Sequence, residues 1–153
     1  MDERIEAFLK EDIGERDITT DAIVPEDHIS KAIILTKANG VVAGHLFARE
    51  VFEFLDRGIQ YHELKQDGER VIKGEKVAVI RGKSRAILTG ERVALNILQR
   101  LSGIATLTRS FVEAVENTGV KIHLQTVHKT MNEKDVMVKD VIKWIELMNS
   151  GST

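Results

Sequence analysis

Over residues 1–88, the apolar residues follow helical spacing in two segments and strand-like runs in the others. Ile5, Phe8, Leu9 and Ile13 recur every three or four positions, which predicts an opening amphipathic helix. A helix is also predicted from His45 to Arg57, because its apolar positions have the same spacing and Gly58 follows. Strands are predicted from their residue composition at 31–37, 41–43, 59–64, 77–80 and 86–88. Turn signals such as Asn39-Gly40 separate them.

Two connector helices are predicted after residue 88. Thr89 is placed to cap the first, and Ser102-Gly103 separates it from the second, which ends at Thr118-Gly119. Their apolar stripes are Val93, Ile97, Leu98 and Leu101, then Ile104, Leu107, Phe111 and Val115. Strands at 120–124 and 136–138 and an apolar helix at 141–148 follow. The pattern predicts an α+β fold, with a strand-rich domain and its connector helices over residues 1–118 and a strand–helix segment over 119–153.

Composition narrows the classes of function. The 153 residues include 42% hydrophobic and 30% charged residues, which are globular proportions. A net charge of −2 gives no general electrostatic attraction to nucleic acid or anionic membranes, and no window has the roughly 20 apolar residues of a membrane helix. With no cysteine, disulfides and thiolate chemistry are excluded, so we expect a cytoplasmic protein.

The most informative stretch lies between residues 88 and 108. It contains TGERVALN at 89–96 and LSGIAT at 101–106. Glu91-Arg92 is predicted to be a charged pair in the first turn of a helix. The ordinary alternative is that the two side chains are simply a solvated pair on the surface. Asn96 and Gly103 disfavour helix interiors by roughly 0.5–1 kcal/mol relative to alanine. Gly103 therefore indicates a close backbone approach or a kink, with tight packing as the simpler explanation.

These runs resemble the quinolinate phosphoribosyltransferase family, in which a Glu-Arg pair opens a helix that ends in Leu-Ser-Gly-Ile-Ala-Thr. EDIGERDITT at 11–20 and GVVAG at 40–44 are similar to other parts of the family pattern. The resemblance covers residues 1 to about 122. It implies an N-terminal α/β sandwich of the hammerhead or barrel-sandwich type, followed by an α/β barrel.

The resemblance also implies an activity. Family members join quinolinate to phosphoribosyl pyrophosphate in NAD biosynthesis, forming nicotinate mononucleotide, pyrophosphate and CO₂ with Mg²⁺. They are homodimers, and an arginine of the neighbouring subunit enters each active site. That arginine matches Arg92, and a guanidinium suits a dicarboxylate because it binds carboxylates bidentately.

The match weakens in the barrel portion, which looks shortened to an incomplete remnant over residues 119–153. Where the family has Asp-Thr-Arg-Lys-Thr, the chain has Gln125-Thr126 and then Lys129-Thr130, without the arginine. Lys139-Asp140 matches the Lys-Asp of a later family strand. The resemblance implies substrate binding by Arg92, Thr126, Lys129 and Lys139, with Lys139 also catalytic. The expected Mg²⁺ carboxylates lie beyond the matched segment, so no metal ligand is assigned and this chain alone is expected to have turnover at or below detection.

Three alternatives remain open. A related phosphoribosyltransferase-like protein associated with molybdate transport would share the fold. A biotinyl or lipoyl carrier is suggested by DGERVIKGEKV at 67–77, although Lys73 and Lys76 lack the usual neighbouring methionine. The third is a non-catalytic dimerisation domain retained from the enzyme.

Overall fold

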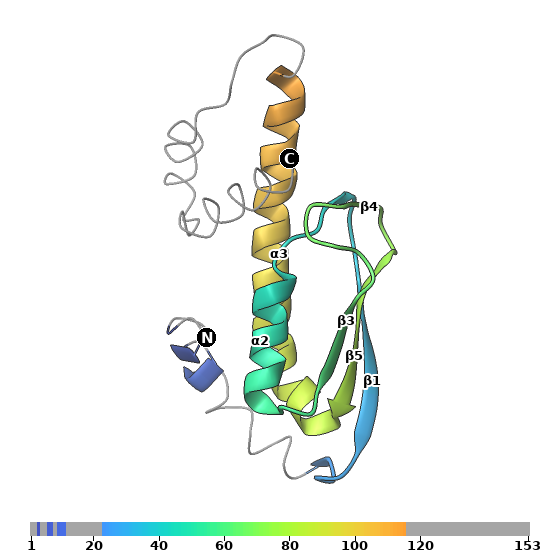
Figure 1. Ribbon diagram of the computed structural model, residues 1–153, viewed down its shortest axis with the longest axis vertical. Helices are drawn as coiled ribbons and strands as arrows, with labels where there is room; N and C mark the ends of the chain where they lie inside the picture. Colours follow the sequence, from blue (N-terminus) through green and yellow to red (C-terminus); the bar gives the residue numbers. More distant parts are fainter. Residues whose placement is uncertain (1–2, 4–5, 8, 12–22, 116–153) are drawn as a thin grey trace.

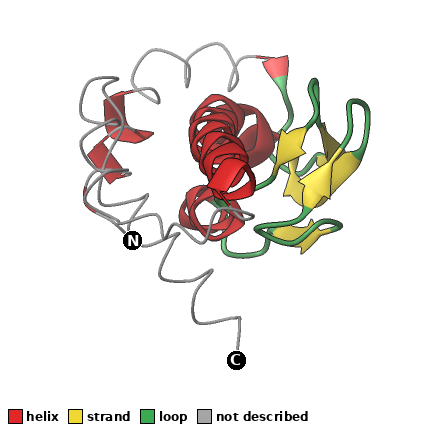
Figure 2. Ribbon diagram, turned by 90° about the horizontal axis from the view of Figure 1, so that it is seen from above, coloured by secondary structure: helices red, strands yellow, loops and turns green. Residues whose placement is uncertain are grey.

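The structure is a computed structural model that describes residues 3, 6–7, 9–11 and 23–115. Their main body has two layers, with two helices covering one face of a small antiparallel sheet (Figures 1 and 2). This arrangement confirms the predicted mixed α/β class. The predicted barrel remnant lies outside the described residues.

The larger sheet has three strands in the order β1-β5-β3, namely Ile29–Leu35, Lys76–Lys83 and Gln60–Glu63. Both pairings are antiparallel, with Lys31 opposite Arg81 and Tyr61 opposite Ile80. Exposure alternates along β1, because successive side chains of a strand point to opposite faces. A second sheet pairs β2 (Gly40–Val41) with β4 (Arg70–Val71).

The helical layer consists of α2 (His45–Leu55) and the longer α3 (Ser84–Val115). They lie side by side against the sheet (Figure 1). Phe52 of α2 is the largest side chain among the fully buried ones, and the main core also contains Val51, Ile80 and Leu98. Leu9, in the described part of the predicted opening helix, is fully buried in this core, as its place in the apolar stripe predicts.

The predicted strand at residues 86–88 is wrong. β5 ends at Lys83 and α3 begins at Ser84 without an intervening loop. Ala86 and Ile87 are buried, and they begin a buried helical stripe that continues at Gly90 and Val93. A short apolar run has no periodicity of its own and suits either element. Thr89 therefore lies buried inside α3 and does not cap its start.

The predicted break at Ser102-Gly103 is also wrong, because α3 is continuous through both residues. A Cβ on Gly103 would meet no atom within 4 Å, so neither close approach nor tight packing explains this glycine. The second predicted stripe is displaced as well. Ile104 and Ala105 are buried, whereas Leu107 and Phe111 are exposed in the described chain.

The remaining elements differ from prediction mainly at their ends. The strand predicted at 31–37 lies at 29–35, and the strand predicted at 59–64 lies at 60–63. The helix predicted from His45 to Arg57 ends at Leu55. The elements predicted at 120–124, 136–138 and 141–148 lie outside the described residues.

Candidate functional site

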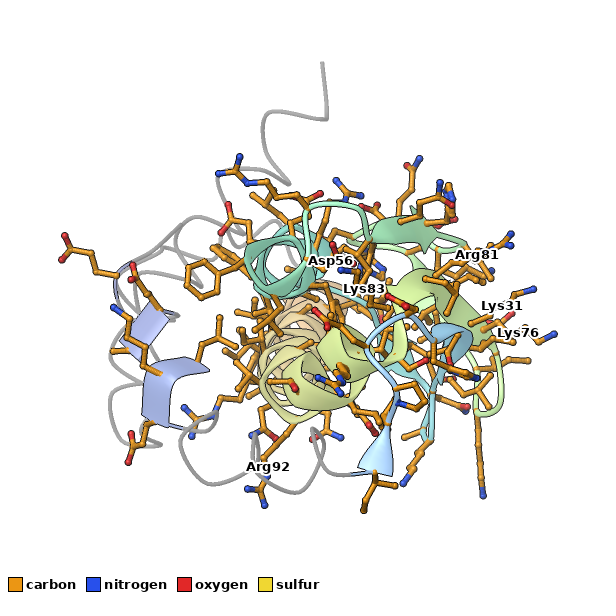
Figure 3. All side chains as sticks on the ribbon, turned by 90° about the horizontal axis from the view of Figure 1, so that it is seen from below. Lys31, Asp56, Lys76, Arg81, Lys83 and Arg92 are labelled. Atoms are coloured by element: carbon orange, nitrogen blue, oxygen red, sulfur yellow. The ribbon has the colours of Figure 1, made fainter. Side chains whose placement is uncertain are left out.

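Arg92 is exposed on the surface of α3. Along the helix it lies beyond the first turn, although it was predicted within that turn. Figure 3 shows its side chain pointing outward from the body of the chain, apart from Lys31 and Arg81 of the sheet. The neighbouring Glu91 lines a groove between α3 and β1. Thr126, Lys129 and Lys139 lie outside the described residues, so their grouping with Arg92 stays a prediction.

The groove beside Arg92 has a volume of about 1070 Å³. Ala32 and Ile34 of β1 line one side, and Leu88, Leu95 and Leu107 of α3 line the other. Its walls are mainly apolar, which suits contact with another segment of protein better than binding of a small polyanion.

The two family-like motifs at residues 40–44 and 101–106 contact each other directly. Thr106 Oγ1 accepts a hydrogen bond from the backbone N–H of Val41 at 2.9 Å. Ser102 Oγ accepts from Ala43 N at 3.0 Å and lies 3.2 Å from Ala43 O, to which it can donate. Four residues apart on a helix, the two hydroxyls share one face. They satisfy backbone groups at Val41 and Ala43, both of which are buried.

Glycines make this contact possible. A Cβ on Gly40 would lie 2.6 Å from Thr106 Oγ1, and a Cβ on Gly44 would lie 2.8 Å from Leu101 Cδ1. The small residues let the backbone of 40–44 approach α3 closely. Both motifs are visible in the sequence, but their pairing was not predicted. The same-face spacing of Ser102 and Thr106 was the available signal.

We expect Ser102→Ala and Thr106→Val each to lower the free energy of unfolding by about 1–3 kcal/mol, because each leaves a buried N–H without its acceptor. Urea unfolding of the two variants measures the loss. Ser110→Ala is the matched control, since Ser110 Oγ donates only to Leu107 O of its own helix and is exposed. Losses no larger than that of Ser110→Ala would contradict the structural role of the two hydroxyls.

A buried polar pair at the start of α2 was also missed. His45 Nδ1 and Tyr61 Oη are 2.7 Å apart, and both side chains are buried. Burial raises the pKa of Tyr61, and the negative charges of Glu63 and Asp67 raise it further, whereas Arg49 opposes them. Arg49 also lies over the Tyr61 ring and pairs with Glu63. The phenol is therefore held neutral, as a structural link between α2 and β3.

The described residues contain no cluster of metal-binding side chains. Among them, no three or more His, Cys, Asp or Glu side chains are grouped closely enough to hold a metal. We therefore assign no Mg²⁺ ligand to this part of the chain. Nor does any helix of the described part combine the length and apolar character needed to span a membrane.

Comparison with known proteins gives a family match over much of this fold. The family model described as "Quinolinate phosphoribosyl transferase, N-terminal domain" matches residues 17–102. A probable nicotinate-nucleotide pyrophosphorylase (carboxylating) from Bacillus subtilis is 43% identical over 115 residues, covering 75% of this chain and 39% of the relative. Quinolinate phosphoribosyltransferase (decarboxylating) 1b from Nicotiana tabacum is 36% identical over 148 residues, covering 96% of this chain and 40% of the relative.

Solved structures agree. NadC from Streptococcus pyogenes superposes with a TM-score of 0.71 at 38% identity, over 75% of this chain and 41% of that one. The nicotinate-nucleotide pyrophosphorylase from Francisella tularensis gives a TM-score of 0.69 at 35% identity, over 75% and 40%. The chain thus spans about two fifths of the length of these relatives. On the family match and these similarities, the chain belongs to the quinolinate phosphoribosyltransferase family, whose N-terminal domain it contains.

Proposed function

We propose that this chain provides the N-terminal, dimer-forming part of a quinolinate phosphoribosyltransferase of NAD biosynthesis, with Arg92 reaching the active site of the partner subunit. The observation that carries the proposal is the exposed Arg92 beside an apolar groove, within a domain that matches this family. The reported relatives are quinolinate enzymes, which favours this function over that of the molybdate-associated homologue.

The proposed reaction explains the choice of arginine. The ring nitrogen of quinolinate forms a bond to C1 of the phosphoribosyl group as the bond from C1 to pyrophosphate breaks. The carboxylate next to that nitrogen then leaves as CO₂, and a proton takes its place. Arg92 would hold a carboxylate of quinolinate through two parallel hydrogen bonds and so fix the orientation of the ring. Mg²⁺ is expected for the family, where it would supply positive charge to the phosphate groups of the substrate.

We further propose that residues 119–153 are a shortened remnant of the barrel domain. Thr126, Lys129 and Lys139 would bind the anionic groups of the substrates, with Lys139 acting at the reacting centre. Three cationic side chains, counting Arg92, offer too little charge to stabilise departing pyrophosphate. The chain alone would therefore have turnover at or below detection. We also propose that it is a cytoplasmic homodimer that binds small molecules.

Subunit complementation tests the role of Arg92. The full-length Bacillus subtilis relative, with its matching arginine replaced by alanine, would be mixed with this chain, and heterodimers would be isolated through separate affinity tags. We expect this chain to restore nicotinate mononucleotide formation, because its Arg92 would enter the relative's active site. The product can be quantified by chromatography.

The chain carrying Arg92→Ala should restore about 10- to 100-fold less activity. The reason is that it loses a hydrogen bond to a charged group, and such a bond contributes a factor of about this size. Arg92→Lys should also restore poorly, because an ammonium cannot bind a carboxylate bidentately. Equal restoration by heterodimers of all three forms would rule out Arg92 as the supplied group. Product formation by this chain alone would contradict the proposed lack of turnover.

A further inference from the structure

The groove between α3 and β1 leaves apolar side chains open on both of its walls. Ile33 of β1 is 43% exposed, and Leu88 and Leu107 of α3 are 42% and 38% exposed. Only two charged residues line the groove in the described part of the chain, namely Lys37 and Glu91. A contiguous, almost uncharged surface of this kind is typical of a contact with another protein segment, and that segment must itself be apolar.

One glycine of this groove has no role among the described residues. Gly103 lies in the interior of α3, is exposed, and lines the groove. Glycine is unfavourable inside a helix, and a Cβ at this position would meet nothing within 4 Å. The bare backbone at Gly103 therefore leaves room for a large side chain from a segment that packs closely against α3.

A segment of matching character follows α3 in the same chain. Residues 141–148, which lie outside the described residues, have six apolar side chains in eight positions and include Trp144, the single tryptophan. No other window of eight residues outside the described part is as apolar. The two polar positions, Lys143 and Glu146, are three residues apart. A helix over this segment would place them on one stripe and leave a wide apolar face that needs a partner.

The connection is long enough to bring this segment back to the groove. The last groove residue on α3 is Ser110, and the helix ends at Val115. The 25 residues from 116 to 140 can span about 80 Å when extended, whereas the groove follows α3 for about 33 Å from Leu88 to Ser110. A tethered segment also has a high effective concentration, which favours it over a separate partner molecule.

We propose that residues 141–148 occupy the groove of their own chain, with the Trp144 ring packed against Gly103. The apolar face of the segment covers the exposed walls at Ile33, Leu88 and Leu107. The near absence of charge in the groove matches the low charge of the segment, which has one lysine and one glutamate. This inference does not rest on the proposed activity, because Arg92 has no part in it.

Fluorescence of Trp144 tests the contact, since no other tryptophan contributes. In the folded chain its emission should be blue-shifted relative to that in urea, and acrylamide should quench it less. Gly103→Leu fills the space for the ring, and this overpacking should weaken docking by about ten- to a hundredfold, seen as a red shift and stronger quenching. Arg100→Leu is the matched control, because it adds the same side chain to an exposed position of α3 outside the groove.

A charge on the groove wall gives a second test that leaves the glycine in place. Leu107→Lys would put an ammonium group under the docked segment, and the cost of burying it should also release Trp144. Phe111→Lys is its control, because Phe111 is likewise exposed on α3 but does not line the groove. Circular dichroism checks that all four variants keep the fold.

The proposal is supported if Trp144 is shielded in the unmodified chain and becomes accessible only in Gly103→Leu and Leu107→Lys. An unmodified chain whose Trp144 is quenched as readily as in urea would overturn it. So would a shielded Trp144 that ignores both groove variants, or responds equally to the controls, since the ring would then pack elsewhere. Shielding that is lost on dilution would also reject it, because a tethered segment docks independently of protein concentration.

Discussion

Phe52→Ala should lower the free energy of unfolding by about 3–5 kcal/mol, a large share of the roughly 5–15 kcal/mol of a typical domain. Phe52 is only 1% exposed and belongs to the main core cluster. Its ring lies 6.2 Å from that of Tyr61, and a Cβ on Gly90 of α3 would be 3.1 Å from its Cδ1 and Cε1 atoms. Removing the ring would leave a cavity where α2, α3 and the sheet meet, which closely packed neighbours cannot fill.

Urea unfolding followed by circular dichroism measures this loss. Phe54→Ala is the matched control, because Phe54 lies two residues away on the same helix and is 48% exposed. That substitution should cost less than about 1 kcal/mol, as expected for a surface position. Similar losses for the two variants would show that the α2–α3 contact is not the centre of stability.

Gly44→Ala should lower the free energy of unfolding by about 2–5 kcal/mol, for two separate reasons. Gly44 precedes α2 with φ at 107°, a conformation that costs an ordinary residue about 1–2 kcal/mol. The added methyl would also lie 2.8 Å from Leu101 Cδ1 and 3.3 Å from Leu101 Cβ, and such overpacking typically costs another 1–3 kcal/mol. The substitution would push α2 away from α3 at the point where the two family-like motifs meet.

Gly74→Ala separates the two causes. Gly74 has a similar φ of 90°, but a Cβ there would meet nothing within 4 Å. It should therefore show only the backbone cost of about 1–2 kcal/mol. The difference between the two unfolding free energies measures the clash with Leu101. If the variants are equally stable, the close approach of residues 40–44 to α3 does not limit stability.

Local pattern was sufficient for β1 and α2. The strand-like composition of residues 31–37 located β1 within two residues of its observed bounds, and helical spacing located α2. It failed at Ala86-Ile87-Leu88, where three apolar residues suit a strand or a helix equally well. It failed again at Ser102-Gly103, because the packing of α3 on either side offsets the unfavourable propensity of one glycine.

For the candidate site, the sequence singled out Arg92 but misplaced it. The predicted helix began at Thr89, so the arginine was expected in the first turn. Because α3 begins at Ser84, Arg92 instead lies inside the helix beside the groove. The pairing of His45 with Tyr61 across 16 residues had no sequence signal, because hydrogen-bonding partners distant in the chain leave no periodic pattern.

The sequence by itself determined the α+β class, most strand and helix positions, and the motifs that resemble the family, because these depend on local spacing and on residue identity. Only the tertiary structure decided that residues 40–44 and 101–106 are partners, that α3 is one continuous helix, and that a groove lies between α3 and β1. The physical reason is that close packing and backbone hydrogen bonding join segments about 60 residues apart, as between Val41 and Thr106, and no local pattern records which segments meet.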